Sequence, residues 1–566
     1  MTIHNLDRIF RPAAVAVIGA SEKQGSIGRA LMENMVKAGY KGALYPVNPR
    51  YRELFGLRSF ESLRAVDGPV DLAVIAIPIT IVPEAIEECA AASVGGAVII
   101  SAGGKETGEK GREMERRILE AARKGSVRLI GPNCLGIVVA ESGLNASFAH
   151  HMPLPGKLAF VSQSGAICTA ILDVSIKERI GFRYFVSVGS MLDVDFGDLV
   201  NYLGQDPEVS SIVLYVESLT SFRKFMSAAR AVSRIKPIVV LKAGRSPAGA
   251  KAAASHTGAL AGSDEVYDTA FRRAGILRVE SIEELFDCAE LMAKQPRPAG
   301  SGLAIITNSG GPGVMAADAL ASFGMDPAPL SDTTLSRLNE VLPPFWSHGN
   351  PIDILGDASA ERYYRAVEIC VDAPEVNALL IMMCPQALSD PTAVAETLVS
   401  LFRNRRLSIF TVWLGASDVE KGREIFNNAG IPTYETPERA IGAFMSMVTY
   451  TRNLELLQQA PPKLPRDLTF DQEAARQLVD AALASGHATL TEVESKALLT
   501  YYGIPVNPTE VAGSAEEAVA SANRVGYPVV MKIHSRAITH KSEAQGVVLD
   551  LRDDEAVRRS FAQVVE

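Results

Sequence analysis

Short apolar runs alternate with helix-length amphipathic segments through residues 13–458, and this alternation limits what the chain can fold into. The runs are rich in Val and Ile, and most of them are followed directly by Gly, Ser or Asn. Examples are AAVAVI before Gly, KLAFV before Ser and LAIIT before Asn. Continuous apolar runs of this kind are typical of strands buried on both faces of a parallel sheet. We therefore predict an α/β protein built from doubly wound modules.

Pauses in the alternation divide the chain into domains. A chain of 566 residues is too long for a single hydrophobic core and should form about three to five domains. The pauses fall near 145–156, near 294–301 and in a proline-rich polar stretch that begins at 459. The predicted units are 1–145, 146–297, 298–458, a linker at 459–485 and a last unit at 486–566. That last unit has helix and strand signals but is too short to be a complete larger domain.

Composition favours small-molecule partners in a reducing compartment. The chain is 47% apolar and 21% charged, and its net charge of −9 argues against a nucleic-acid-binding surface. The six cysteines form no CxxC pair, which indicates buried free thiols. No apolar run reaches the roughly 20 residues needed to cross a bilayer. We expect a cytoplasmic protein with no membrane contact, and no metal site is predicted.

A glycine-rich turn follows the first predicted strand, in VAVIGASEKQGSIGRALMENM. Gly19, Gly25 and Gly28 allow a ligand to approach the backbone, and the start of the next helix offers N–H groups to a phosphate. The glycine spacing is longer than the dinucleotide fingerprint, and the second strand ends at Asn48, where a ribose-binding acid would be expected. This argues against the alternative of an NAD-dependent dehydrogenase, although tight packing alone could also explain the glycines.

The segments IGAS…GSIG, VNPRY, AIP, SAGGKE and GPNCLGI occur in an order that resembles the CoA-binding domain of the NDP-forming acyl-CoA synthetases, the superfamily of succinyl-CoA synthetase. The resemblance covers essentially the whole chain. It implies a Rossmann-like CoA-binding domain, two flavodoxin-like doubly wound domains and the start of an ATP-grasp domain. The residues it implies for CoA binding are Gly19, Ser21, Gly25, Gly28, Asn48, Pro49, Arg50, Pro78 and Asn133. Arg50 can pair with a CoA phosphate, whereas Asn133 could equally be a turn residue that tolerates a left-handed backbone.

Two further strand–turn–helix segments, AFVSQSGAICTAIL and AIITNSGGPGVMAADAL, are candidate anion sites. Each places a hydroxyl or amide and one or more glycines at the start of a predicted helix, where backbone N–H groups are available. The resemblance implies that the two helix starts share one phosphate. The implied phosphate-binding residues are Ser162, Ser164, Gly165, Asn308, Ser309, Gly310 and Gly311.

His256 lies within AAASHTGALAG, a stretch of small residues that we interpret as a mobile loop. From its residue type alone it could be a surface-loop histidine without a function. However, more than thirty residues around it resemble the phosphohistidine segment of the family. This implies that His256 carries a phosphoryl group covalently and that Glu217, at the end of a predicted strand, contacts its ring. The alternative for Glu217 is an exposed strand-end glutamate.

The segment GYPVVMKIHSRAITHKSEAQGVVLDL resembles the opening of an ATP-grasp domain. Lys532 matches a lysine that contacts nucleotide phosphates, although it could also be a solubilising strand-edge lysine, and His540 matches a second phosphoryl relay. ATP or ADP with Mg²⁺ is expected to bind only where the ATP-grasp domain is complete. Two residues depart from the family pattern: Ser190 replaces a common Asn, and Gln545 replaces the first Gly of a Gly-Gly pair.

Together these features predict an ADP-forming acyl-CoA synthetase, an acid–thiol ligase that interconverts acyl-CoA, ADP and phosphate with carboxylate, CoA and ATP. Acyl phosphate and phosphohistidine are the expected intermediates. The expected partners are a small carboxylate or its acyl-CoA, phosphate and nucleotide, in a homo-oligomer or a complex with an ATP-grasp chain. The alternative is a non-catalytic CoA- or acyl-CoA-sensing module, or a subunit that needs a separate nucleotide-binding chain; the short last unit favours this alternative and the histidine segment opposes it.

Overall fold

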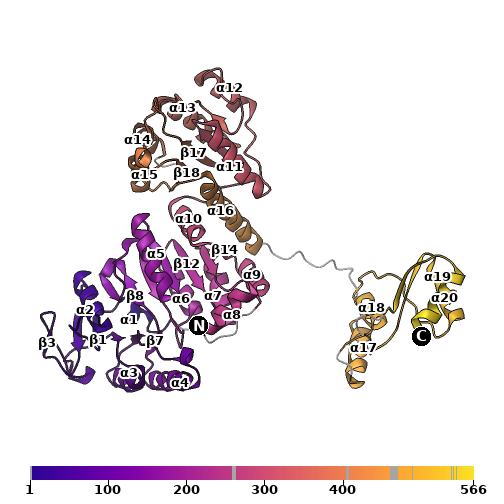
Figure 1. The fold of residues 1–566 in the computed structure, drawn as a ribbon, viewed down its shortest axis with the longest axis horizontal. Helices are drawn as coiled ribbons and strands as arrows, with labels where there is room; N and C mark the ends of the chain where they lie inside the picture. Colours follow the sequence, from indigo (N-terminus) through magenta and orange to yellow (C-terminus); the bar gives the residue numbers. More distant parts are fainter. Residues whose placement is uncertain are drawn as a thin grey trace. The chain divides into compact units, whose positions relative to one another are not determined.

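The computed structural model describes residues 3–257, 263–402, 407–458, 470–486, 489–536, 538, 541–542 and 545–565. The chain divides into two units, Met1–Gln459 and Ala460–Glu566 (Figure 1). Within the described part of the chain, none of the helices combines the length and the hydropathy that a membrane span requires.

The first sheet is parallel, with the order β2-β1-β5-β6-β7. The strands of this sheet and the helices around it are α1 (Leu6–Phe10), β1 (Ala14–Ile18), α2 (Ile27–Lys37), β2 (Ala43–Val47), β5 (Leu72–Ile75), α3 (Val82–Ala91), β6 (Gly96–Ile99), α4 (Glu109–Lys124) and β7 (Arg128–Ile130). Between β2 and β5, β3 (Glu53–Leu54) and β4 (Leu57–Arg58) form a separate antiparallel pair. The chain moves from β1 to β2 on one side and returns to β5 on the other. The strand order therefore reverses between β1 and β5, and ligands of such sheets bind at the carboxyl ends of the strands at that point.

The second sheet has the order β14-β13-β12-β10-β11-β8-β9. Its elements are β8 (Gly136–Val139), β9 (Leu144–Ser147), β10 (Leu154–Ser162), α5 (Gly165–Lys177), β11 (Gly181–Ser187), α6 (Phe196–Gln205), β12 (Ser211–Val216), α7 (Phe222–Val232), β13 (Ile238–Lys242), α8 (Pro247–Thr257), α9 (Asp264–Arg273), β14 (Leu277–Val279) and α10 (Ile282–Lys294). Strands β10 to β14 are parallel, and the hairpin β8–β9 adds an antiparallel edge through β11. The predicted boundary at residue 145 falls inside β9, and both strands of this hairpin belong to the second sheet.

The third sheet is parallel, with the order β16-β15-β17-β18-β19. Its elements are β15 (Leu303–Thr307), α11 (Gly310–Ser322), α12 (Asp332–Val341), β16 (Ile352–Asp353), α13 (Ala360–Val371), β17 (Ala378–Met383), α14 (Pro391–Phe402), β18 (Ser408–Trp413), α15 (Ser417–Asn428), β19 (Thr433–Tyr434) and α16 (Pro437–Gln458). Every residue of β15, β17 and β18 is buried, as expected of strands covered on both faces. The prediction of parallel, doubly wound α/β modules is confirmed.

The second unit begins with a pair of helices and continues with a short hairpin between two more helices. Its elements are α17 (Gln472–Ala484), α18 (Glu492–Tyr501), α19 (Ala515–Val525), β20 (Val529–Lys532), β21 (Val547–Leu551) and α20 (Asp554–Val565). Strands β20 and β21 are antiparallel, and α19 packs against α20. Helix α17 occupies 472–484 of the stretch predicted as a linker, because Asp471 caps an alanine-rich amphipathic sequence there.

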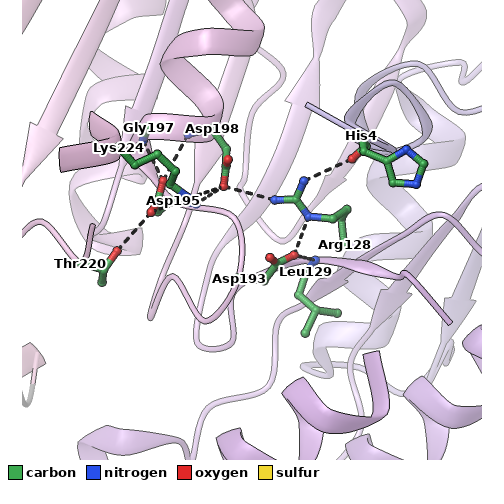
Figure 2. Close-up of polar contacts among 9 residues, drawn as sticks. All are labelled: His4, Arg128, Leu129, Asp193, Asp195, Gly197, Asp198, Thr220 and Lys224. Atoms are coloured by element: carbon green, nitrogen blue, oxygen red, sulfur yellow. Dashed lines mark hydrogen bonds and ion pairs between the residues drawn. The ribbon is translucent and has the colours of Figure 1, made fainter. Parts of the chain in front are cut away.

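Buried charges join the first and second sheets of the first unit (Figure 2). Arg128, the first residue of β7, is 11% exposed, and its guanidinium donates to carboxylate oxygens of Asp193 at 2.8 Å and Asp198 at 3.2 Å. Lys224 on α7 donates to Asp198 at 2.8 Å and to Asp195, the N-cap of α6, at 2.9 Å. The two cations thus give partner charges to the buried carboxylates of Asp195 and Asp198 and to the partly exposed carboxylate of Asp193.

Replacing Arg128 with methionine is expected to lower the local free energy of unfolding by about 2–3 kcal/mol, because Asp193 and Asp198 lose a buried charged donor. Hydrogen exchange of the β7 amides measures this loss. Arg116→Met is the matched control: this arginine on α4 is 56% exposed and pairs with Glu113, so its loss should cost less than about 1 kcal/mol. Equal effects of the two substitutions would contradict a special role for Arg128.

Candidate active site

The glycine turn after β1 packs tightly against its neighbours. A Cβ on Gly19 would lie 2.5 Å from the carbonyl oxygen of Ala76, and a Cβ on Gly28 would lie 2.0 Å from the carbonyl oxygen of Gly19. Gly19 and Gly25 also have positive φ values, of 93° and 75°. The glycines therefore let β1, the start of α2 and the residue after β5 come close together, which places the start of α2 beside the carboxyl end of β1, the edge at which ligands of such sheets bind.

Side chains of the glycine turn and of the end of β2 hold the loops at this edge of the sheet in place through hydrogen bonds. The Ser21 hydroxyl accepts from the backbone N–H of Lys23 at 3.0 Å, and Ser26 caps α2 by accepting from the N–H of Arg29 at 3.3 Å. Asn48 donates to the carbonyl of Ala20 at 2.7 Å and accepts from the N–H of Arg50 at 3.0 Å. Asn48 thus fixes the turn against β2 and positions the backbone of Arg50, whose side chain, like Pro49, is exposed.

The remaining predicted CoA-binding residues lie at the same edge of the first sheet. Pro78 is exposed and follows β5, and Asn133 is exposed and follows β7. Asn133 has a φ of 56°, and its N–H donates to the carbonyl of Ser101 at 3.0 Å. Asn133 therefore has the left-handed backbone expected of a turn residue. Its side chain is also exposed, and its role in CoA binding stays a prediction.

The start of α5 lies where the second sheet reverses its strand order, between β10 and β12. The Ser162 hydroxyl donates to the carbonyl of Ser164 at 2.9 Å and accepts from its N–H at 3.1 Å. Ser164 in turn caps α5 by accepting from the N–H of Ile167 at 3.3 Å. Gly165 is the first helical residue, so this turn presents the N-terminus of α5 at the reversal point.

The third sheet repeats this construction. Thr307, the last residue of β15, makes the same pair of hydrogen bonds to the backbone of Ser309, at 2.9 and 3.1 Å. Ser309 is the N-cap of α11, and Gly310 and Gly311 are its first residues. The Asn308 amide joins β15 to the end of β17 by two hydrogen bonds of 2.9 Å to the backbone of Cys384. The starts of α5 and α11 belong to separate sheets (Figure 1), so their sharing of one phosphate stays a prediction.

Gln163 joins the start of α5 to Glu217 across the reversal point. Its side-chain oxygen accepts from the backbone N–H of Glu217 at 2.5 Å and from that of Ser218 at 2.8 Å. Sequence reasoning missed Gln163, although it occupies the place in SQSG that Asn308 occupies in TNSG. Glu217 is 7% exposed, so the alternative of an exposed strand-end glutamate is wrong.

A buried lysine that sequence reasoning also missed lies one strand away. Lys242 ends β13, is 1% exposed and pairs in register with Val216, the residue before Glu217. Its ammonium lies 4.6 Å from the ring centroid of Tyr267, and burial lowers the pKa of Lys242 despite the opposing fields of Asp264 and Glu217. The ammonium of Lys242 and the carboxylate of Glu217 are therefore both buried, and the field of each acts on the other in a medium of low dielectric constant.

His256 lies in helix α8, where the sequence suggested a loop. Ser246 accepts from the N–H of Gly249 at 3.1 Å at the start of this helix, and the alanine-rich sequence that follows has high helix propensity. The side chain of His256, residues 258–262 and the whole of His540 lie outside the described residues. The contact between His256 and Glu217 therefore stays a prediction.

A cavity of about 780 Å³ lies beside the start of α8, between α9 and β14. Its arginines already have carboxylate partners: Arg278 donates to Asp264 at 2.7 and 2.8 Å, and Arg245 pairs with Glu280 at 3.1 Å. Since these cations are neutralised in place, the cavity offers no better phosphate site than the predicted helix starts.

The two departures from the family pattern lie at ordered positions. The Ser190 N–H donates to the carbonyl of Pro132 at 2.9 Å, and the Ser190 carbonyl accepts from the ammonium of Lys105 at 2.9 Å, so its backbone lies against the loops that follow β6 and β7. Gln545 has a φ of 54°, a left-handed conformation that favours glycine. A Cβ on the neighbouring Gly546 would lie 2.5 Å from a side-chain carbon of Ile533.

Replacing Gln545 with glycine is expected to stabilise the β20–β21 hairpin by about 0.5–1 kcal/mol, because glycine adopts this backbone conformation without a steric cost. Hydrogen exchange of the β21 amides measures the gain. Gln545→Ala removes the same side chain but keeps a Cβ, so it should give no gain; equal stabilisation by alanine would show that backbone strain is not the cause.

Four family models match consecutive parts of the chain. They are a CoA binding domain at residues 13–140, a succinyl-CoA ligase like flavodoxin domain at 155–292, a Ligase-CoA domain at 303–458 and an ATP-grasp domain at 481–566. The chain is also 40% identical over 556 residues to the ADP-forming acetate–CoA ligase I of Archaeoglobus fulgidus, a match that covers 98% of this chain and 79% of that protein. The chain belongs to the ADP-forming acyl-CoA synthetase family.

Two other members of the family extend the comparison. The alpha subunit of the ADP-forming acetate–CoA ligase I of Pyrococcus furiosus is 40% identical over 456 residues, which are 79% of this chain and 98% of that subunit. The structure of the dinucleotide forming acetyl-coenzyme A synthetase 1 of Ca. Korarchaeum cryptofilum, in complex with phosphate and ADP, matches with a TM-score of 0.77 and 36% identity over 81% of this chain and 99% of that chain. The resemblance stated from the sequence motifs is thus confirmed, together with its fold.

Proposed function

We propose that the protein is an ADP-forming acyl-CoA synthetase that interconverts acyl-CoA, ADP and phosphate with carboxylate, CoA and ATP. The observation that carries this proposal is the junction between β10 and β12, where Gln163 joins the start of α5 to the buried Glu217. This junction combines a helix N-terminus, which favours an anion, with a buried carboxylate that can orient an imidazolium or imidazole ring. Family membership supports the same assignment.

The edge of the first sheet at the carboxyl ends of its strands, called the CoA crevice from here on, would bind the acyl-CoA thioester. In the direction of ATP synthesis, an oxygen of inorganic phosphate attacks the thioester carbonyl, and the CoA thiolate leaves as the acyl phosphate forms. Gly19, Asn48, Pro78 and Asn133, at one edge of the first sheet, would hold the CoA, and Arg50 would pair with one of its phosphates.

His256 would then carry the phosphoryl group. One ring nitrogen attacks the phosphorus of the acyl phosphate and the carboxylate leaves, which gives phosphohistidine. Glu217 would accept a hydrogen bond from the other ring nitrogen and stabilise the charge that develops on the ring. The starts of α5 and α11 would hold the phosphoryl oxygens, and a terminal phosphate oxygen of ADP completes the transfer by attacking the phosphohistidine.

The nucleotide step is assigned to the second unit, through Lys532 and the second relay His540. We further propose that the protein acts in the cytoplasm, as a homo-oligomer or with an ATP-grasp chain. The P. furiosus relative supports such a division, because its alpha and beta subunits are separate proteins that match 79% and 16% of this chain.

Phosphate transfer into the protein tests this function without any nucleotide. Incubation with radioactive phosphate and acetyl-, isobutyryl- or phenylacetyl-CoA should give an acid-labile label on the chain, and omission of the thioester should prevent it. A chain that binds CoA but takes up no label with any of these thioesters would favour the alternative, a CoA- or acyl-CoA-sensing module.

A further inference from the structure

Three lysines of the second unit converge on a single carboxylate. One carboxylate oxygen of Glu492 accepts a hydrogen bond from the ammonium of Lys532, at the end of β20, at 2.8 Å. The other oxygen accepts from the ammonium of Lys541, in the connection to β21, at 3.0 Å. Lys496, one turn further along α18, lies 3.2 Å from the first oxygen. Both oxygens of one side chain are therefore held by ammonium groups from three different segments.

The charges in this cluster do not balance. Three ammonium groups face one carboxylate, which leaves a local excess of two positive charges among these four side chains. Glu492 is also the first residue of α18, so the positive end of the helix dipole adds to the same field. Hydrogen bonds from Lys532 and Lys541 lower the pKa of Glu492 to about 2. A carboxylate thus neutralises only part of a site that could take an ion of higher charge.

The same contacts attach α18 to the hairpin. Beside the Glu492 cluster, Arg536 from the β20–β21 connection pairs with Glu494, whose side chain also accepts from the N–H of Thr491 in the capping box of α18. That second pair is balanced, one cation to one anion. Among the described residues of this contact, the excess positive charge therefore lies with the lysines around Glu492.

We propose that Lys496, Lys532 and Lys541 form a binding site for the phosphates of a nucleoside diphosphate, and that Glu492 occupies this site when no nucleotide is bound. The proposal rests on the proposed function, which already gives Lys532 a nucleotide role, and adds two lysines and an internal competitor. A diphosphate carries more negative charge than one carboxylate and offers more acceptor oxygens, so it satisfies the three ammonium groups better. Nucleotide would then displace Glu492 and loosen α18 from the hairpin.

Binding of ADP to the full chain, measured by titration calorimetry, tests this competition. Glu492→Gln should bind ADP about tenfold more tightly than the unsubstituted protein, because the amide no longer competes for the lysines, and Lys541→Met should bind about tenfold more weakly. Glu516→Gln is the matched control, because Glu516 pairs with Arg558 at 2.9 Å elsewhere in the same unit. It should leave ADP affinity unchanged. Equal or weaker binding by Glu492→Gln, or absence of ADP binding in all four proteins, would overturn the proposal.

Hydrogen exchange in the unsubstituted protein gives a second readout that does not depend on how the variants fold. ADP should accelerate exchange at the amides of the first turn of α18, since Glu492 is displaced. Unchanged or slower exchange there would overturn the proposal. Neither measurement requires phosphate labelling from acyl-CoA, so a failure of the proposed function and a failure of this site give different results.

Discussion

Replacement of His256 with alanine is expected to lower acyl-CoA-dependent labelling by radioactive phosphate at least about a thousandfold. The physical reason is that the imidazole nitrogen is itself the phosphoryl acceptor, and no neighbouring group can substitute for a missing nucleophile. Alanine is the strongest helix former, so this substitution preserves α8, in which His256 lies. Acid-labile label on the intact chain, followed over time, is the measurement.

The control for this variant is His151→Ala, which removes an exposed histidine between the hairpin β8–β9 and β10. It should label at the rate of the unsubstituted protein. Acid-labile label that persists in His256→Ala would remove this residue from the role of phosphoryl carrier, and mapping the labelled peptide would then identify the residue that replaces it.

Glu217→Gln is expected to slow labelling by about a thousandfold while leaving the CoA crevice intact. Glutamine keeps the shape of the side chain but lacks the charge that would orient the ring of His256 and stabilise it as the phosphoryl group transfers. Gln163 accepts its hydrogen bonds from the backbone N–H groups of Glu217 and Ser218, so these bonds survive the substitution. The initial rate of label uptake at saturating phosphate and acetyl-CoA measures the effect.

Glu280→Gln provides the matched control, since this glutamate follows β14 as Glu217 follows β12, but its side chain is 74% exposed. Its labelling rate should stay within about twofold of the unsubstituted protein. An unchanged rate in Glu217→Gln would remove the carboxylate from the mechanism. The thermal transition of each variant should be recorded as well, because Lys242 is buried nearby and loses a neighbouring negative charge.

The strands could be predicted from the sequence because a buried parallel strand leaves a local signal. ALLIMM and SIFTVW, the sequences of β17 and β18, are apolar or small throughout, and both are completely buried. The glycine turn after β1 left a comparable signal, since Gly19 and Gly28 lie where a Cβ would meet backbone. The strand signal lies within one element, and Gly28 meets Gly19 nine residues earlier; the contact of Gly19 with Ala76 reaches across to the next strand, but the glycine itself is visible in the sequence.

The missed features depend on which strands become neighbours. Gln163 can reach Glu217 only because β10 lies beside β12, although 54 residues separate the two side chains. Lys242 has the sequence of an ordinary strand end, and its burial is completed by Tyr267, which α9 places beside it. The helical state of α8 was missed for another reason: small residues suggest a loop, but an alanine-rich run after a serine cap favours a helix.

The buried ion pairs of Arg128 have a mechanical consequence. They join the strand that precedes Asn133 to the loop and helix that lead toward β12, and therefore to Glu217. The crevice assigned to the thioester and the carboxylate assigned to the histidine thus belong to one braced frame. If acyl phosphate forms at this frame, its phosphorus would not have to move between two separate domains to reach the proposed nucleophile, His256. On the proposed mechanism, the acyl chemistry and the formation of phosphohistidine would both take place at this frame, and only the phosphoryl group on His256 would leave it.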